Sequence, residues 1–238
     1  MGKRGPKPRD PATIEWSPRL AYAVGLIATD GCLSGDGRHI TLTSKDKEQI
    51  ITFRSCLGLE RIKIGKYASG RSGQGGRKDC LRLQFGDVGF YRWLLGIGLT
   101  PNKSKTIGPL KIPDRYFFDF FRGCFDGDGC IYGYWDPRWR SSYMYYCGIA
   151  SASPVFLRWL QEVIERFVGV RGKISRAGGG TQQLRFAKAG TKVILKKMYH
   201  TKDAPYLKRK FVKAEKILTI DKQHNQNAQV AELVYAYA

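Results

Sequence analysis

Two nine-residue stretches decide how this chain folds: AVGLIATDG at residues 23–31 and FRGCFDGDG at residues 121–129. Each has glycine at its third position and closes on Asp-Gly, with Asp30 and Asp128 as the closing acids. About a hundred residues separate the two acids, which is the spacing of a duplicated structural unit rather than of a local motif. The sequence therefore predicts two related halves that each contribute one carboxylate.

Small side chains recur at helical spacing within both stretches. Positions three and seven are Gly25 and Thr29 in the first copy and Gly123 and Gly127 in the second. Residues four apart lie on one face of a helix, so we expect the two motif helices to pack closely through these positions. Their last turns then place the two acids side by side.

Two carboxylates at helix C-termini are doubly unfavourable, because each meets the negative end of a helix dipole and the other acid. A divalent cation relieves both effects, and oxygen ligands suit Mg²⁺. We therefore expect Asp30 and Asp128 to bind metal, in the neighbourhood of Ala28 and Gly127. A metal held next to phosphate activates water and stabilises the leaving oxygen.

Composition points to a polyanionic partner. The 238 residues include 41 Lys and Arg against 20 Asp and Glu, a net charge of +21, which favours nucleic acid. The six cysteines form no CxxC pair, which argues against a zinc ribbon or a disulfide framework. Without a membrane-length apolar run or a signal-peptide core, we expect no membrane partner and an intracellular protein, not a secreted one, in a bacterial or archaeal cytoplasm or an organelle.

Periodicity divides the chain into four parts: a basic flexible arm at 1–15, halves at 16–112 and 113–222, and a tail at 223–238. Helical patterns cover 18–30, 45–57, 87–97, 116–128, 153–168 and 191–199. Strand patterns cover 38–43, 62–67, 80–85, 130–134, 143–150, 172–176 and 182–187, with a strand entry at 33–37. Short alternating strands joined by hairpin loops predict an α+β protein with antiparallel sheets.

The duplicated motif resembles that of the LAGLIDADG homing endonucleases in their single-chain, two-motif form, over roughly residues 17 to 220. The resemblance implies two pseudo-symmetric αββαββα halves, packed through the motif helices, with saddle-shaped sheets in the DNA major groove. It implies that Asp30 and Asp128 bind metal and each cut one strand, giving a staggered break in a long, asymmetric site. Ala28, Asp126, Arg122 and Cys124 depart from the usual motif but leave both acids in place.

The same resemblance implies a catalytic lysine late in each half. The nearest matches are Lys105 in TPNKSK and Lys210 in APYLKRK, and Lys103 and Lys208 fit almost as well. It also places solvent-organising side chains near Ser44 and Ser151. Mg²⁺ is the expected cofactor, with Mn²⁺ as a substitute and Ca²⁺ supporting binding without cleavage.

Polar strand faces and hairpin tips supply the expected contacts to double-stranded DNA, because Arg reads G and Gln reads A at major-groove edges while most other basic side chains contact phosphate. In the first half these are Arg38, Thr41, Thr43, Arg61, Lys63, Lys66, Arg71, Arg77, Lys78 and Arg82. In the second half they are Tyr134, Trp135, Arg138, Arg140, Tyr143, Lys173, Arg176, Gln182, Gln183 and Arg185.

Two alternatives use the same scaffold: an RNA maturase with a host intron RNA as its partner, and a non-catalytic DNA-binding regulator. Acids in both motifs favour the nuclease over the regulator, whereas a maturase is compatible with both acids. Two unequal copies in one chain form a pseudo-dimer, so we expect a functional monomer. The resemblance further implies an intron-encoded protein that acts in intron homing.

Overall fold

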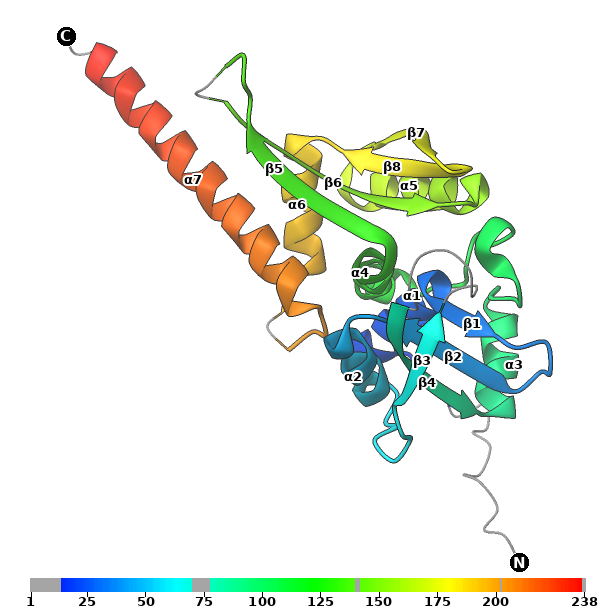
Figure 1. The fold of residues 1–238 in the computed structure, drawn as a ribbon. Helices are drawn as coiled ribbons and strands as arrows, with labels where there is room; N and C mark the ends of the chain where they lie inside the picture. The colour runs from blue at the N-terminus through cyan, green and yellow to red at the C-terminus, as the bar shows by residue number, and fades with distance from the viewer. Residues whose placement is uncertain (1–13, 70–77, 140–141, 202, 237–238) are drawn as a thin grey trace, which may run out of the picture.

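A computed structural model describes residues 14–69, 78–139, 142–201 and 203–236, which form two similar halves (Figure 1). The first half comprises α1 (Pro18–Thr29), β1 (Gly31–Leu33), β2 (His39–Ser44), α2 (Lys47–Cys56), β3 (Gly65–Ser69), β4 (Lys78–Gly86) and α3 (Val88–Gly96). Two short 3-10 turns, η2 (Lys103–Lys105) and η3 (Asp114–Tyr116), lie in the connection. The second half comprises α4 (Phe117–Asp128), β5 (Gly129–Trp135), β6 (Tyr143–Ser151), α5 (Pro154–Val168), β7 (Lys173–Gly178), β8 (Thr181–Phe186), α6 (Lys188–Met198) and α7 (Lys208–Ala236).

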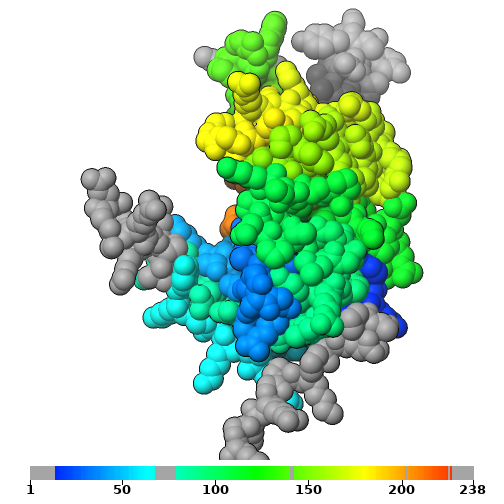
Figure 2. All heavy atoms as spheres, turned by 90° about the vertical axis from the view of Figure 1, so that its right-hand side faces the viewer, coloured from blue at the N-terminus to red at the C-terminus, as the bar shows by residue number. Residues whose placement is uncertain are grey.

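Each half contains one four-stranded antiparallel sheet, and the two sheets have the same topology. The strand orders are β1-β2-β4-β3 and β5-β6-β8-β7. The registers also match, because Leu42 pairs with Gly31 and Leu83 while Ile149 pairs with Gly129 and Leu184. The predicted α+β architecture with two αββαββα halves is confirmed, and Figure 2 shows the first half below the second.

Helix starts follow from local sequence. Ser17 caps α1 by accepting a 3.1 Å hydrogen bond from the Leu20 amide, and Pro18 occupies the first helical position, as expected from the Ser-Pro pair. The same arrangement begins α5, where the Ser153 side chain caps the helix ahead of Pro154. These caps fix where each helix begins and therefore where the following strands start.

The two motif helices pack against each other at backbone distance (Figure 1). A Cβ atom built on Gly25 would lie 2.1 Å from the Phe120 carbonyl oxygen, and one built on Gly123 would lie 2.1 Å from the Tyr22 carbonyl oxygen. Neither position has room for a methyl group. The predicted contact through the third motif positions is thereby confirmed.

One motif departure is explained by burial. Arg122 is fully buried, and its guanidinium donates a 2.6 Å hydrogen bond to Asp119 and a 2.7 Å hydrogen bond to the Pro205 carbonyl oxygen. It also donates to the carbonyl oxygen of Met198 at the end of α6. A charged group placed in a core must be paired and hydrogen-bonded in this way, so Arg122 joins α4 to the segments on either side of residue 202.

The C-terminal region differs from its expected division. Helix α7 runs without a break from Lys208 to Ala236, so the expected boundary between 222 and 223 falls inside a helix. Helix α7 has almost no amphipathic periodicity, so local pattern does not predict this continuation. In Figure 1, α7 (orange to red) runs alongside the β5–β6 hairpin. None of the described helices has the length and apolarity needed to cross a bilayer.

Candidate active site

Asp30 and Asp128 lie beside each other where α1 and α4 end. Asp30 is the C-cap of α1 and Asp128 is the last residue of α4. A Cβ on Gly127 would stand 2.1 Å from the Thr29 Oγ1 and 3.1 Å from an Asp30 carboxylate oxygen, so the seventh motif positions bring the two helix ends together. Close helix packing therefore converts two distant acids into one site.

The electrostatics of the pair are those of partly desolvated like charges. Burial, and then the negative charge of Asp30, raise the pKa of Asp128 to about 6, against the opposing influence of Lys210 and Lys103. Burial also raises the pKa of Asp30, while a hydrogen bond from Gln49 and the same two lysines act to lower it. An arrangement of oxygen donors that raises carboxyl pKa values suits a hard divalent cation.

The two acids have unequal supports. The Gln49 side-chain amide donates a 2.8 Å hydrogen bond to Asp30 Oδ2, and the Ser44 hydroxyl in turn contacts Gln49 Oε1. Gln49 is the third residue after its helix cap, and the residue in that place in the second half is Phe156, which has no polar group to offer. Sequence patterns missed Gln49, because a glutamine within an amphipathic helix has no distinguishing signal.

Two buried lysines stand in matching places next to the acids. Lys103 Nζ donates to the Gly31 carbonyl oxygen, and Lys210 Nζ donates to the Gly129 carbonyl oxygen at 2.7 Å, each glycine closing one motif. Lys105 and Lys208 are instead exposed. The structure thus retains the expected Lys210 but places Lys103, rather than the expected Lys105, at the acids of the first half.

Burial lowers the pKa of both lysines. Desolvation lowers the pKa of Lys210 to about 8, with Asp126 and Asp30 acting in the opposite direction. Desolvation also lowers the pKa of Lys103, while Cys32, Asp30 and Asp128 act to raise it. Both ammonium groups act on the two motif carboxylates, whose pKa values they lower.

An open hollow of about 210 Å³ borders Asp128. Asp128 lines it together with four hydroxyl side chains and four apolar ones, namely Thr29, Ser104, Ser151 and Thr181, and Ala28, Ala150, Ala152 and Ile107. Ser151 is therefore close to the site, as expected, while Ser44 reaches Asp30 through Gln49. Among the described residues no group of three or more His, Cys, Asp or Glu side chains is placed to hold a metal ion. A cation held by the two acids would complete its coordination with water or phosphate oxygens.

Each sheet turns one apolar face to the core and one polar face outward. In the first sheet, Thr41 and Thr43 pair with Gln84 and Arg82, and Arg82 lies over the Tyr67 ring with its guanidinium carbon 5.1 Å from the ring centroid. The alternation of buried and accessible residues along β2 confirms the expected outward placement of both threonines. Arg38, Arg61 and Lys63 are exposed next to these strands.

The outer face of the second sheet carries a row of stacked tyrosines. Tyr146 stacks with Tyr132 and Tyr134 at ring-centroid distances of 5.4 and 6.3 Å, and Arg185 lies 5.3 Å from the Tyr146 centroid. The strand register puts Gln183 and Lys173 on this face too. This surface therefore offers both cationic and aromatic groups.

Several expected contacts occupy the opposite faces of their strands. Tyr143 is buried, and the Trp135 ring makes tilted contacts with it and with His224 of α7, so both side chains turn away from the outer face. The strand register also places Lys66, Arg176 and Gln182 on the face of the sheet that turns toward the core. Arg138 is exposed and forms an ion pair with Asp136. Arg71, Arg77 and Arg140, and the side chain of Lys78, lie outside the described residues.

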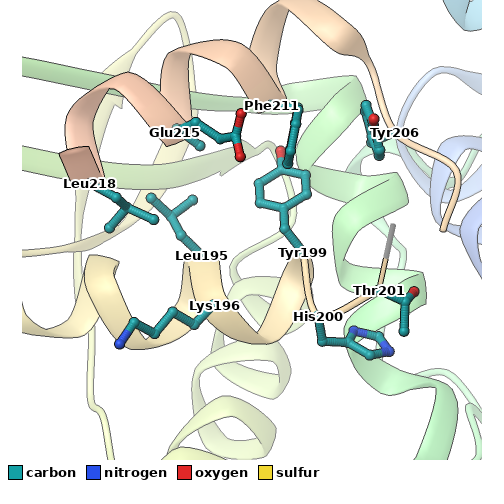
Figure 3. A pocket seen from close by; sticks show the side chains of 10 residues that line it. Leu195, Lys196, Tyr199, His200, Thr201, Tyr206, Phe211, Glu215 and Leu218 are labelled. Atoms are coloured by element: carbon teal, nitrogen blue, oxygen red, sulfur yellow. The ribbon is translucent and has the colours of Figure 1, made fainter. Parts of the chain in front are cut away.

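A separate hollow of about 760 Å³ lies between α6 and α7 (Figure 3). Three aromatic residues, Tyr199, Tyr206 and Phe211, line it together with both apolar and polar side chains. Figure 3 shows Glu215 and Leu218 reaching it from α7 and Leu195 and Lys196 from α6. Neither motif acid lines this hollow, so we assign it no part in the acidic site.

Comparison with solved structures defines the class of fold. The chain superposes on the homing endonuclease I-WcaI bound to its DNA recognition sequence, with a TM-score of 0.60 and 12% identity over 84% of this chain and 88% of the other. For the LAGLIDADG meganuclease I-AabMI bound to uncleaved DNA, the TM-score is 0.58 with 12% identity, over 89% of this chain and 92% of the other. For full-length DUF199/WhiA from Thermatoga maritima, the TM-score is 0.55 with 14% identity, over 95% of this chain and 71% of the other.

No protein-family model and no curated protein matches the sequence itself. The structural likeness, at these low identities, shows the fold. The chain has the two-motif LAGLIDADG fold, with both motif helices at the junction of the halves, as the sequence motif predicted.

Proposed function

We propose that this protein is a site-specific DNA endonuclease that hydrolyses phosphodiester bonds in a metal-dependent reaction. The observation that carries the proposal is the pair Asp30 and Asp128, side by side between two sheets whose outer faces expose arginine, glutamine and tyrosine. The DNA-bound structures of I-WcaI and I-AabMI support double-stranded DNA as the partner. Each acid is assigned to one strand, so the product is a staggered double-strand break.

The residues of this chain have distinct roles in that reaction. A divalent cation, expected to be Mg²⁺, would be held by Asp30 and Asp128 and would supply an activated water and charge stabilisation at phosphate. The Lys103 and Lys210 ammonium groups stand next to the acids and offset the negative charge that builds up on the attacked phosphate. Gln49 orients Asp30 through its 2.8 Å hydrogen bond.

The two unequal halves support a long, asymmetric target that one chain reads as a monomer, without a second subunit. Gln49 and Phe156 at matching places make the two acids unequal, so we expect the two strands to be cut at unequal rates. A role in intron homing remains part of the proposal.

The test is selection from a randomised duplex library with Mg²⁺ and, in parallel, with Ca²⁺. We expect specific cleavage with Mg²⁺, and binding to the same sequences without cleavage in Ca²⁺. Affinity should fall about 10³-fold or more between roughly 50 and 200 mM salt, because many phosphate contacts release counterions. A protein that binds no DNA in either arm would refute the proposal.

A non-catalytic DNA-binding regulator is the second candidate, and the likeness to WhiA over 95% of this chain favours it. Sequence-specific binding in both arms of the selection, with no cleavage in Mg²⁺ or Mn²⁺, would establish this candidate instead. An RNA maturase would bind structured intron RNA in competition with the selected duplex.

A further inference from the structure

Strand register makes residues of the two sheets equivalent one by one. Leu83 and Leu184 hold the same ladder position, opposite Leu42 and Ile149 respectively. The aligned strand sequences are LRLQF at 81–85 and QQLRF at 182–186, so both end on a buried phenylalanine. The outward positions on either side of the shared leucine can therefore be compared directly.

The outward residues of these two strands are exchanged between the halves. Arg82, opposite Thr43, is equivalent to Gln183, opposite Ala150. Gln84, opposite Thr41, is equivalent to Arg185, opposite Gly148. Each half thus has one arginine and one glutamine on its outer face, in opposite order.

The outward residues can be divided into an inner and an outer pair by their distance from the two acids. Strand β2 ends at Ser44, which reaches Asp30 through Gln49, so the Thr43–Arg82 pair lies nearer the acids than the Thr41–Gln84 pair. In the second half, Ala150 lines the same hollow as Asp128. Arg82 and Gln183 are therefore the inner pair, and Gln84 and Arg185 are the outer pair.

Neighbouring groups hold the two arginines outward. The Arg82 guanidinium lies over Tyr67, while that of Arg185 lies over Tyr146 and donates a 3.4 Å hydrogen bond to the Tyr132 hydroxyl. A Cβ on Gly148 would come 3.2 Å from the Gln183 amide nitrogen, so glycine leaves room for this side chain above the sheet. Stacking of this kind restricts the side chain before DNA binds, which lowers the entropy lost on binding.

We propose that the target carries G and A at mirrored positions in opposite order: G facing Arg82 and A facing Gln183 in the inner pair, A facing Gln84 and G facing Arg185 in the outer pair. Arginine pairs with the O6 and N7 atoms of guanine, and glutamine with N6 and N7 of adenine. The assignment rests on the proposed DNA-binding function and adds the base preferences of that site. It makes the target non-palindromic at both pairs.

The test is selection of bound duplexes in Ca²⁺ by the whole chain, followed by the same selection with variants. Arg82→Gln should convert the inner G to A while the other half keeps its preference. The double variant Arg82→Gln with Gln84→Arg should select the same order in both halves and hence a palindromic pair. Each matched contact should favour the stated base about 5- to 150-fold, since one such pair is worth about 1–3 kcal/mol.

Lys66→Gln is the matched control, because it also replaces one cation by glutamine, but at an exposed position on the opposite strand face. We expect uniformly weaker binding and an unchanged base profile from this variant. If the wild type binds specific DNA but shows no G or A preference at the mirrored positions, or if Arg82→Gln leaves the profile unchanged, the base assignment is wrong while the endonuclease proposal stands. Failure to bind any duplex would overturn both.

Discussion

The Tyr22 hydroxyl donates a 2.8 Å hydrogen bond to Asp126 Oδ2, linking the first motif helix to the second across the junction of the halves. The same oxygen accepts a 2.8 Å hydrogen bond from the Leu207 amide, just ahead of α7. Asp126 is almost fully buried, and its pKa is raised to about 6, chiefly by desolvation. The acid at the sixth motif position, where the first half has Ala28, thus joins three segments instead of adding a third carboxylate to the open site.

We predict that Tyr22→Phe lowers the free energy of unfolding by about 1–3 kcal/mol, because it leaves a buried carboxylate short of a donor. Urea denaturation of the purified protein measures the change. Tyr67→Phe is the matched control, since the Tyr67 ring is exposed on the outer face of the first sheet. Equal stability of the two variants would show that the cross-junction hydrogen bond contributes nothing.

Gly25→Ala should be strongly destabilising, because its methyl group would meet the Phe120 carbonyl oxygen at 2.1 Å and push the motif helices apart. Overpacking of this kind costs about 1–3 kcal/mol or more. Gly35→Ala provides the control, as nothing lies within 4 Å of the added atom and its backbone has no positive φ. Thermal melting compares the two, and a Gly25→Ala variant as stable as Gly35→Ala would contradict the observed helix contact.

The two lysines of η2 should behave differently in cleavage. Lys103→Met removes a buried ammonium next to both acids, so we expect at least a tenfold loss of cleavage rate with DNA binding largely kept. Lys105→Met removes only an exposed charge and should retain the rate, with slightly weaker binding. Single-turnover cleavage with melting curves for both proteins measures this. The opposite pattern would restore Lys105 as the catalytic residue.

Metal affinity should depend on pH through Asp128, because a cation competes with protons for a carboxylate whose pKa is raised to about 6. Affinity for Ca²⁺ in the DNA complex should be level above pH 7 and fall as the pH drops through 6, where the acid takes up a proton. Calorimetry between pH 5 and 8 tests this, and Asp128→Asn should bind more weakly throughout with less pH dependence. A wild-type affinity that is constant across this range would argue against Asp128 as a ligand.

Much of the fold is predictable because its determinants are local or repeated. Ser17-Pro18 specifies a helix start, alternation specifies strand faces, and glycines at the third motif positions specify a close helix contact. The duplication then relates the halves without any long-range information. Asp30 and Asp128 follow from the motif alone.

The remainder of the site depends on tertiary packing that no local pattern encodes. The segments leading to Lys103 and Lys210 differ in length, so spacing alone did not decide between Lys103 and Lys105. Gln49 becomes important only because α2 lies against the end of α1. Strand alternation places Trp135 and Tyr143 on the face opposite the tyrosine row, and Trp135 there contacts His224 of α7, a helix unforeseen from sequence.

Strand-resolved cleavage by Asp30→Asn and Asp128→Asn tests the central claim most directly. Both variants keep the shape of the side chain but lose a charge, so we expect each to bind the selected duplex as well as the wild type, or more tightly, and to lose double-strand cleavage in Mg²⁺. Asp114→Asn, which alters only a surface ion pair with Arg166, should cut at the wild-type rate. If Asp30→Asn and Asp128→Asn also cut both strands at that rate, the two acids are not the active site.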